Sequence, residues 1–409
     1  MSVYLDHAAT SPIRPEVAQV VHEAMLELGN PSSLHSGGRA TRRRVEEARE
    51  DLADALGARP SEVLFTSGGT ESDNLAVKGL YRHRRAADPR RCRLVVSSAE
   101  HSAVLDSVED LVTHEGAEVT WVDPDRNGVV GADSFRAAIE DDELGGPDNV
   151  VGVLGMWANN ETGVVQPIGG ISTVAGEYGL PVFTDAVQAV GKVPVDFAGS
   201  GATLLAATGH KIGGPVGTGI LLATRDAPMR AISHGGGQER RLRSGTLAMP
   251  LIVGLARAVR LAVDRSAEEA GRLAELRDRL VRGVLDTVQG SRVTGVWEPG
   301  DVVQRVPTHA HVLIPGCEGD SLLFLLDAAG VACSTGSACH AGVPQPSHVL
   351  LAMGYPEDEA RGALRLTLGW SSTQGDVDMF LSALPEAVER AQRAHAATVA
   401  RAAAREGSR

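Results

Sequence analysis

The sequence feature that most constrains the fold is a repeated alternation, over residues 61–224, of short apolar runs with amphipathic segments. The runs include VLF (63–65), LVVS (94–97), VVGVLGMWA (150–158), PVFTD (181–185) and ATLLAAT (202–208). Short buried strands separated by helices of about 10–15 residues are typical of a parallel sheet with helices on both faces. In such sheets ligands bind beyond the carboxyl ends of the strands. The residues that follow each run are therefore the first candidates for a site.

The pattern changes near residue 250. A long stretch rich in Leu, Ala and Arg (roughly 250–289) predicts a helix, and shorter strand-like and helix-like segments follow it. This mixture predicts a smaller α+β domain. We expect a large domain at residues 15–250 and a small domain formed by residues 1–14 and 251–409.

Composition narrows the class of protein. Of the 409 residues 43% are hydrophobic, enough for a sizeable core, and the net charge of −13 argues against a nucleic-acid partner. The N-terminus lacks the pattern of a secretory signal, and no apolar run approaches the ~18 residues of a membrane span. Four cysteines in so long a chain make no disulfide framework. We expect a cytoplasmic protein that does not act at a membrane.

Three loops after predicted strands carry candidate residues that are ambiguous when each is taken alone. TSGGTE (66–71) suits an anion at a helix N-terminus, or is an ordinary turn with Thr70 as its cap. His101 follows LVVS, where a single histidine is more often structural. Asn160 lies in NNE (159–161), which either orients a polar ligand or caps a helix.

Lysine is the most informative single residue type, because the chain has only three: Lys78, Lys192 and Lys211. Lys211 follows a buried strand and lies beside His210, so its amine is the best candidate for a Schiff-base nucleophile. Lys78 fits the exposed face of a helix, and Lys192 follows a glycine in a turn.

Asp185 ends a strand, and Gln188 lies three residues later. A carboxylate at this position can hold a proton on a heterocyclic nitrogen, and a nearby amide can bond a ring substituent. The alternative is that Asp185 caps a helix.

The remaining candidates are weaker as isolated features. GGGQERRLRSGT (235–246) suits an anion clamp or a contact between subunits, and Arg365 suits either a carboxylate ligand or a surface ion pair. Cys339 lies in a loop of small residues and should be accessible and activated. Its spacing from Cys333 matches no zinc pattern, so we expect no metal site.

Taken together and in this order, eleven motifs resemble those of the cysteine desulfurases, which are pyridoxal-phosphate enzymes of the class V aminotransferase group. The motifs are YLDHAAT (4–10), GNPSSLH (29–35), FTSGGTESDNLAVKG (65–79), EHSAVL (100–105), ANNETG (158–163), DAVQAVGK (185–192), GHKIGGPVGTG (209–219), GGGQERRLRSGT (235–246), STGSACHAG (334–342), PSHVL (346–350) and RLTLG (365–369). The resemblance runs from residue 4 to about residue 385. It implies an α/β fold of PLP-dependent transferase fold type I, with a mainly parallel seven-stranded sheet. The loop around Cys339 has the longer form of the housekeeping and nitrogen-fixation subgroup.

The resemblance also implies residue roles. Lys211 would hold pyridoxal phosphate covalently, Asp185 would keep the pyridine nitrogen protonated, and Gln188 would bond the phenolic oxygen. His101 would stack on the ring and assist proton transfer, and Asn160 would contact cofactor and substrate. The phosphate would be bound by Gly69, Thr70, Thr208 and His210, with Thr246 reaching in from the partner of a homodimer, and Arg365 would bind the substrate carboxylate.

The implied activity is removal of sulfur from L-cysteine, giving L-alanine and a persulfide on Cys339. The sulfur would pass to an acceptor protein for iron–sulfur cluster assembly or tRNA thiolation. The alternative enzyme is a selenocysteine lyase or a cysteine lyase-like relative on the same fold, and a sulfur-relay or scaffold partner without cofactor chemistry is the alternative class. The chain departs from the family at His340, where Thr or Ser is usual, and at Thr208 and Thr367, where Ser is common. His340 would either lower the pKa of Cys339 or face solvent.

Overall fold

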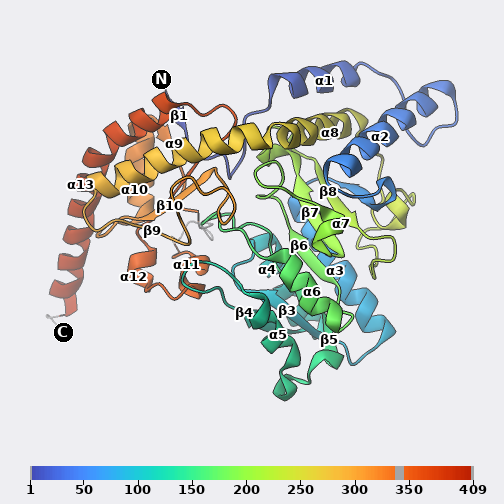
Figure 1. Cartoon of the computed structure of the whole chain (residues 1–409), viewed down its shortest axis with the longest axis horizontal. Coiled ribbons are helices and arrows are strands. Elements are labelled where there is room, and N and C mark those ends of the chain that lie inside the picture. The colour runs from blue at the N-terminus through green and yellow to red at the C-terminus, as the bar shows by residue number, and fades with distance from the viewer. Residues whose placement is uncertain (1, 337–344, 407–409) are drawn as a thin grey trace.

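The computed structural model describes residues 2–336 and 345–406 (Figure 1). The predicted nucleophile Cys339 and its neighbour His340 lie outside the described residues.

A seven-stranded sheet forms the centre of the larger part of the molecule, in the order β2-β8-β7-β6-β5-β3-β4. Its strands are β2 (Val63–Thr66), β3 (Arg93–Ser97), β4 (Glu118–Val122), β5 (Val150–Leu154), β6 (Val182–Asp185), β7 (Leu204–Thr208) and β8 (Gly219–Ala223). All neighbours pair in parallel except β8, which runs antiparallel to β2 and β7. The predicted mainly parallel seven-stranded sheet is confirmed.

Helices cover both faces of this sheet, as the apolar runs predicted (Figure 1). Side chains alternate between the faces along each strand: Leu94 and Val96 pack in one buried cluster, and Val95 packs in another. The first cluster includes apolar residues of α3 (Gly69–Ala87) and α4 (Ser102–Glu115). The helices that contribute to the second are α1 (Pro15–Met25), α2 (Ser36–Ala55), α5 (Ala132–Glu140), α6 (Ile168–Glu177), α7 (Phe197–Ser200) and α8 (Met249–Asp264).

A third buried cluster lies mainly among the elements that follow α8, and Val3 and Leu5 of the N-terminal segment belong to it. The described helices that follow α8 are α9 (Ser266–Thr287), α10 (Gly319–Ala328), α11 (His348–Ala352), α12 (Glu357–Ala360) and α13 (Gln374–Glu406). The strands β9 (Arg292–Val293), β10 (His309–Leu313) and β12 (Ala363–Thr367) form an antiparallel sheet, and β1 (Val3–Tyr4) pairs in parallel with β11 (Val331–Ala332). We propose that the two clusters on the faces of the seven-stranded sheet form the core of the expected large domain, and that the third cluster forms the core of the expected small domain.

The single helix predicted over 250–289 is two helices, α8 and α9, which meet at Arg265. The Ser266 hydroxyl donates to the Val263 carbonyl, a local bond that competes with the helical backbone pattern. The side chain of Arg265 is also paired with Glu16 at 3.3 Å. The part of the chain that the structure describes also has five short 3-10 helices: η1 (Pro60–Glu62), η2 (Asp142–Leu144), η3 (Pro147–Asn149), η4 (Gly209–Lys211) and η5 (Glu239–Arg241).

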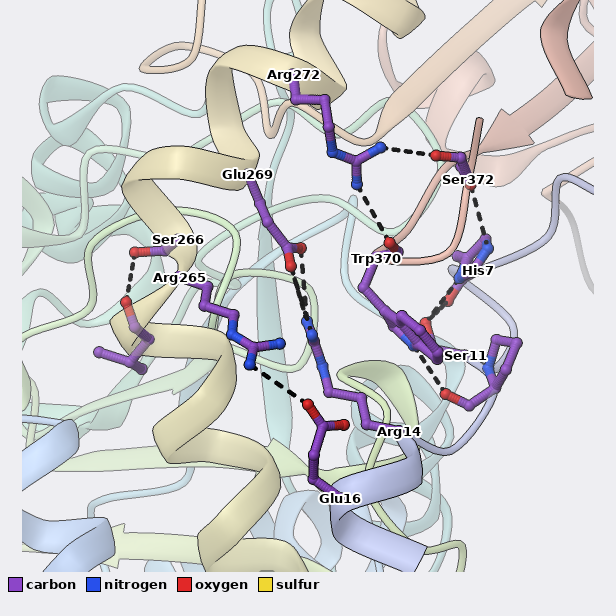
Figure 2. A network of polar contacts seen from close by, with 12 residues as sticks. His7, Ser11, Arg14, Glu16, Arg265, Ser266, Glu269, Arg272, Trp370 and Ser372 are labelled. Carbon is purple, nitrogen blue, oxygen red and sulfur yellow. Dashed lines mark hydrogen bonds and ion pairs between the residues drawn. The ribbon is translucent and has the colours of Figure 1, made fainter. Parts of the chain in front are cut away.

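The N-terminal segment before α1 contacts elements of both parts of the molecule, and its contacts with α9 and with residues 370–372 are seen in Figure 2. Arg14 is paired with Glu269 of α9 at 3.4 Å, and the Trp370 indole donates to the Pro12 carbonyl at 2.9 Å. His7 Nδ1 lies 3.0 Å from the Ser11 hydroxyl. The Arg14 N–H donates to the Gly213 carbonyl at 2.9 Å, between η4 and β8, so residues 7–14 contact both parts of the molecule. Among the described residues, the structure has no helix with the length and apolar character of a membrane span.

Candidate active site

A cavity of about 420 Å³ lies beyond the carboxyl ends of the parallel strands. It is lined by ten of the twelve predicted site residues: Gly69, Thr70, His101, Asn160, Asp185, Gln188, Thr208, His210, Lys211 and Arg365. These residues come from loops that are distant in sequence but share one edge of the sheet, with Arg365 added from β12. Ala8 and Ala9 of the N-terminal segment close the cavity on another side.

Lys211 lies in η4, directly after β7. Its Nζ donates to the carbonyls of Ala8 at 2.6 Å and Ala9 at 2.8 Å. Burial, reinforced by the positive charge of Arg365, lowers the pKa of Lys211 to about 8. A much larger share of this amine is neutral at neutral pH than for an ordinary lysine, as a nucleophilic amine requires.

Asp185 lies at the end of β6, with only 5% of its surface exposed, and its Oδ1 accepts the Val187 N–H at 2.8 Å. Burial raises the pKa of Asp185, and a positive charge on His101 acts in the opposite direction. His101 caps α4, and its Nδ1 accepts the Ala103 N–H, so the proton of the neutral ring lies on Nε2. A cationic heterocycle beside Asp185 would favour its ionised form.

Two further acids near Asp185 were missed by the sequence analysis. Asp73 lies one helical turn after Gly69, and burial, followed by the charges of Asp185 and Glu100, raises its pKa well above the usual range. Burial also raises the pKa of Glu100, whose Oε1 accepts the Met156 N–H at the end of β5. The sequence signals were weak: Asp73 lies one turn into the helix after the glycine loop, and Glu100 directly precedes His101.

A cradle for an anion is formed at the N-terminus of α3. A Cβ added to Gly69 would lie 3.1 Å from Val187 Cγ2 and 3.8 Å from Thr208 Cβ, so only glycine leaves this space open. The first N–H groups of α3 and the hydroxyl of Thr70 border it. The Thr208 hydroxyl donates to the Thr218 carbonyl, and must turn from it to donate to an anion. Burial lowers the pKa of His210 to about 4, so its ring is neutral near pH 7.

Arg365 forms the opposite side of the cavity. Its two terminal nitrogens donate to the Asn160 carbonyl at 2.9 Å and to Asp6 Oδ1 at 3.0 Å, while its Nε is buried and has no hydrogen-bond partner. Oδ1 of Asn160 is also buried and has no hydrogen-bond partner. A donor and an acceptor are thus available for a ligand that carries both a carboxylate and a polar hydrogen.

The sequence interpretation of Lys192 was incomplete. It does lie in the turn after β6, but its Nζ donates to Gln188 Oε1 at the wall of the cavity. Burial, followed by the charges of Lys211 and Arg365, lowers the pKa of Lys192 to about 7. Lys78 of α3 is paired with Asp110 of α4 at 3.0 Å, and it is not in the cavity lining.

Two predicted site residues are not in this cavity lining. Cys339 lies outside the described residues. Thr246 is exposed at the end of a segment over residues 235–246, which we call the strap. The strap is anchored by Glu239, which accepts from Arg49 and from the Phe65 N–H.

Three side chains at this cavity are close enough together to be considered as metal ligands. Asp73, His101 and Asp185 each place one possible ligand atom within 4.8 Å of the others. A carboxyl group with a strongly raised pKa is a poor ligand, because metals bind the ionised form. An amine, a buried carboxylate and an anion cradle around one space instead fit pyridoxal phosphate, which carries an aldehyde, a ring nitrogen and a phosphate.

Comparison with known proteins agrees with this geometry. The model of the family "Aminotransferase class-V" matches residues 3–380. An "IscS-like cysteine desulfurase" from Mycobacterium tuberculosis is 53% identical over 96% of this chain and 97% of that protein.

Solved structures give the same result. A "NifS-like protein" is 32% identical, with a TM-score of 0.84 over 95% of this chain and 100% of that one. The structure titled "SspA in complex with cysteine" is also 32% identical, with a TM-score of 0.75 over 90% of this chain and 99% of that one.

Proposed function

The chain belongs to the cysteine desulfurases of the class-V aminotransferase family, and from this premise we propose that it converts L-cysteine to L-alanine and leaves the sulfur as a persulfide on Cys339. The observation that carries the proposal is the convergence of the Lys211 amine, the buried Asp185 carboxylate and the Arg365 guanidinium on one cavity. A relative solved with cysteine supports the choice of substrate.

The enzyme depends on pyridoxal phosphate, which supplies an electron sink for bonds at the substrate's Cα and Cβ atoms. Lys211 would hold it through the amine, and Asp185 would face the ring nitrogen as a carboxylate. The N-terminus of α3 with Gly69 and Thr70 would hold the phosphate. His101 would lie against the ring, with its Nε2–H directed into the cavity.

Arg365 would bind the substrate carboxylate, because a guanidinium offers two parallel donors to two oxygens. It would exchange its present contacts with Asn160 and Asp6 for that carboxylate. The Lys211 amine would take the proton from the substrate's Cα, a task that suits a group whose pKa is about 8. Burial keeps His101 largely neutral, because it lowers the pKa of that ring, so His101 can accept and return a proton.

The sulfur step balances without an external oxidant. The thiolate of Cys339 attacks the substrate sulfur, the Cβ–S bond breaks, and Cβ gains a proton to give alanine. Cys339 is oxidised to a persulfide, and the substrate carbon is reduced by the same two electrons. This role rests on the sequence motif STGSACHAG (334–342), since Cys339 is outside the described residues.

The test is to add L-cysteine and measure alanine and the mass of the Cys339 peptide. The wild type should release alanine and carry a peptide heavier by one sulfur atom. Lys211→Ala should lose both products and the visible cofactor band. Cys339→Ala should lose the persulfide and most of the sulfide that a thiol reductant releases. Equal sulfide release from wild type and Cys339→Ala would overturn the assignment of the nucleophile.

We also propose the sulfur acceptor, the cellular location and the oligomeric state of the enzyme. We infer an acceptor protein for iron–sulfur cluster assembly or tRNA thiolation, a cytoplasmic location, and a homodimer in which Thr246 contacts the partner's cofactor phosphate. The exposed position of Thr246 on the strap is compatible with that contact. Sedimentation of the holoenzyme tests the dimer, and Thr246→Val should weaken cofactor retention only if the dimer forms.

A further inference from the structure

Lys192 contacts a residue of the cavity lining but has no role in the proposed reaction. It lies seven residues after the end of β6, and its Nζ donates to Gln188 Oε1. It also borders a second, small cavity together with Lys211 and Leu368, and Gln188 is not in the lining of that cavity. Lys192 is itself absent from the lining of the cofactor cavity, so it supports Gln188 without lining that cavity.

The contact fixes which way the Gln188 amide points. An ammonium group has donors only, so the amide oxygen must face Lys192. The amide nitrogen then faces the opposite way, and Nε2 donates to the Ala8 carbonyl at 3.0 Å. That carbonyl accepts only, so both partners of Gln188 require the same orientation.

The orientation matters because Gln188 and Lys211 meet at one point. Both donate to the carbonyl of Ala8, at 3.0 Å and 2.6 Å. In pyridoxal phosphate the aldehyde carbon and the phenolic oxygen are attached to adjacent ring atoms. A cofactor joined to Lys211 would therefore place its phenolic oxygen beside the Gln188 amide.

We propose that Lys192 is a positioning residue that locks the Gln188 amide with its NH₂ group toward the cofactor's phenolic oxygen. Without Lys192 the amide can turn over, since its oxygen and nitrogen have nearly the same size. An amide oxygen would then face the phenolate and repel it. The inference rests on the proposed cofactor attachment at Lys211.

The cofactor's charges should favour the protonated form of Lys192 that this role needs. Burial, followed by the charges of Lys211 and Arg365, lowers the pKa of Lys192. The phosphate and phenolate of the cofactor add negative charge to this cluster. They should therefore hold Lys192 in the protonated form that has donors only.

The test is the pH midpoint of the cofactor's visible absorbance change, measured on the holoenzyme without substrate. A donor at the phenolate lowers that midpoint, because it stabilises the form in which the nitrogen joined to the cofactor has lost its proton. Lys192→Met should raise the midpoint by about one pH unit. Lys192→Arg keeps an obligate donor and should stay within about 0.3 unit of wild type. Lys78→Met removes the third lysine, on the α3 surface, and is the matched control.

A double-mutant comparison separates orientation from simple charge. In a Gln188→Ala background, Lys192→Met should move the midpoint by less than about 0.3 unit. A full shift in that background would mean that Lys192 acts by charge alone and would overturn the proposal. So would a midpoint in Lys192→Met equal to that of Lys78→Met. A wild-type protein without a visible band that depends on Lys211 would instead refute the proposed function.

Discussion

Glu239 is the anchor of the strap, and replacing it tests how a strained segment is held in place. Glu239, Arg240 and Arg241 all have positive φ, at 44°, 58° and 62°. Residues with side chains rarely adopt this conformation, and each costs about 1 kcal/mol. The hydrogen bonds of the Glu239 carboxylate offset this strain: it accepts from Arg49 at 2.8 and 3.0 Å and from the Phe65 N–H at 2.7 Å.

The strain of the three residues and the stabilisation by the Glu239 carboxylate are of similar size. The Arg49 and Glu239 side chains are 11% and 2% exposed, so Glu239→Ala leaves a largely buried cation. Breaking a buried pair costs about 3–5 kcal/mol, and the lower figure applies because Glu46 remains 3.1 Å from Arg49. Three strained residues release about 3 kcal/mol when they relax. The strap of the variant should therefore open by itself, before the rest of the molecule unfolds.

Hydrogen exchange of strap amides measures this opening. The Leu242 N–H donates to the Glu239 carbonyl, and the Gly245 N–H donates to Gln238 Oε1. A loss of about 3 kcal/mol should speed their exchange roughly 100-fold, while global unfolding changes by less than about 1 kcal/mol. Glu46→Ala is the control, because that side chain is 49% exposed and its pair contributes little. Unchanged strap exchange together with a global loss of 3 kcal/mol would refute the reasoning.

Three other predictions follow from the cavity. Gly69→Ala should weaken cofactor affinity at least about tenfold in an absorbance titration, because the new Cβ would enter the anion cradle and would lie 3.1 Å from Val187 Cγ2. The rate of cofactor capture by apoprotein should rise about tenfold between pH 7 and 9, because the pKa of Lys211 is about 8; a rise near 100-fold would indicate an ordinary lysine. Asp73→Asn should stabilise the apoprotein by about 1–2 kcal/mol at pH 8 and not at pH 4, as measured by denaturant unfolding. The sign follows from the raised pKa of Asp73: its stabilising protonated form is favoured at low pH and lost as pH rises.

The sheet was predictable because its determinants are local. Leu94, Val95 and Val96 alternate between two cores, and the polar residue after each strand necessarily lies at one edge. Because Asp185 and Lys211 lie at that edge, their place at one cavity could be predicted without knowing how the helices pack.

The contacts that sequence reasoning missed depend on distant packing. Asp73 reads as an ordinary charged residue of a helix, and only the sheet beneath α3 brings it to Asp185. Lys192 reads as a turn residue, because nothing in the spacing shows that its amine turns back to Gln188. The break between α8 and α9 depends on a serine side-chain bond that helical periodicity does not reveal.

The N-terminal segment also has a consequence for how the protein is made. The Ala8 N–H donates to the Thr367 hydroxyl across 359 positions of the chain, and the carbonyl of the same residue accepts from Lys211. During translation the seven-stranded sheet is complete long before β12 leaves the ribosome. The hydrogen bond that holds the Ala8 N–H can therefore form only after almost the whole chain has been synthesised. A nascent chain that ends before β12 would carry Lys211 but would lack both Arg365 and the Thr367 hydroxyl that holds Ala8.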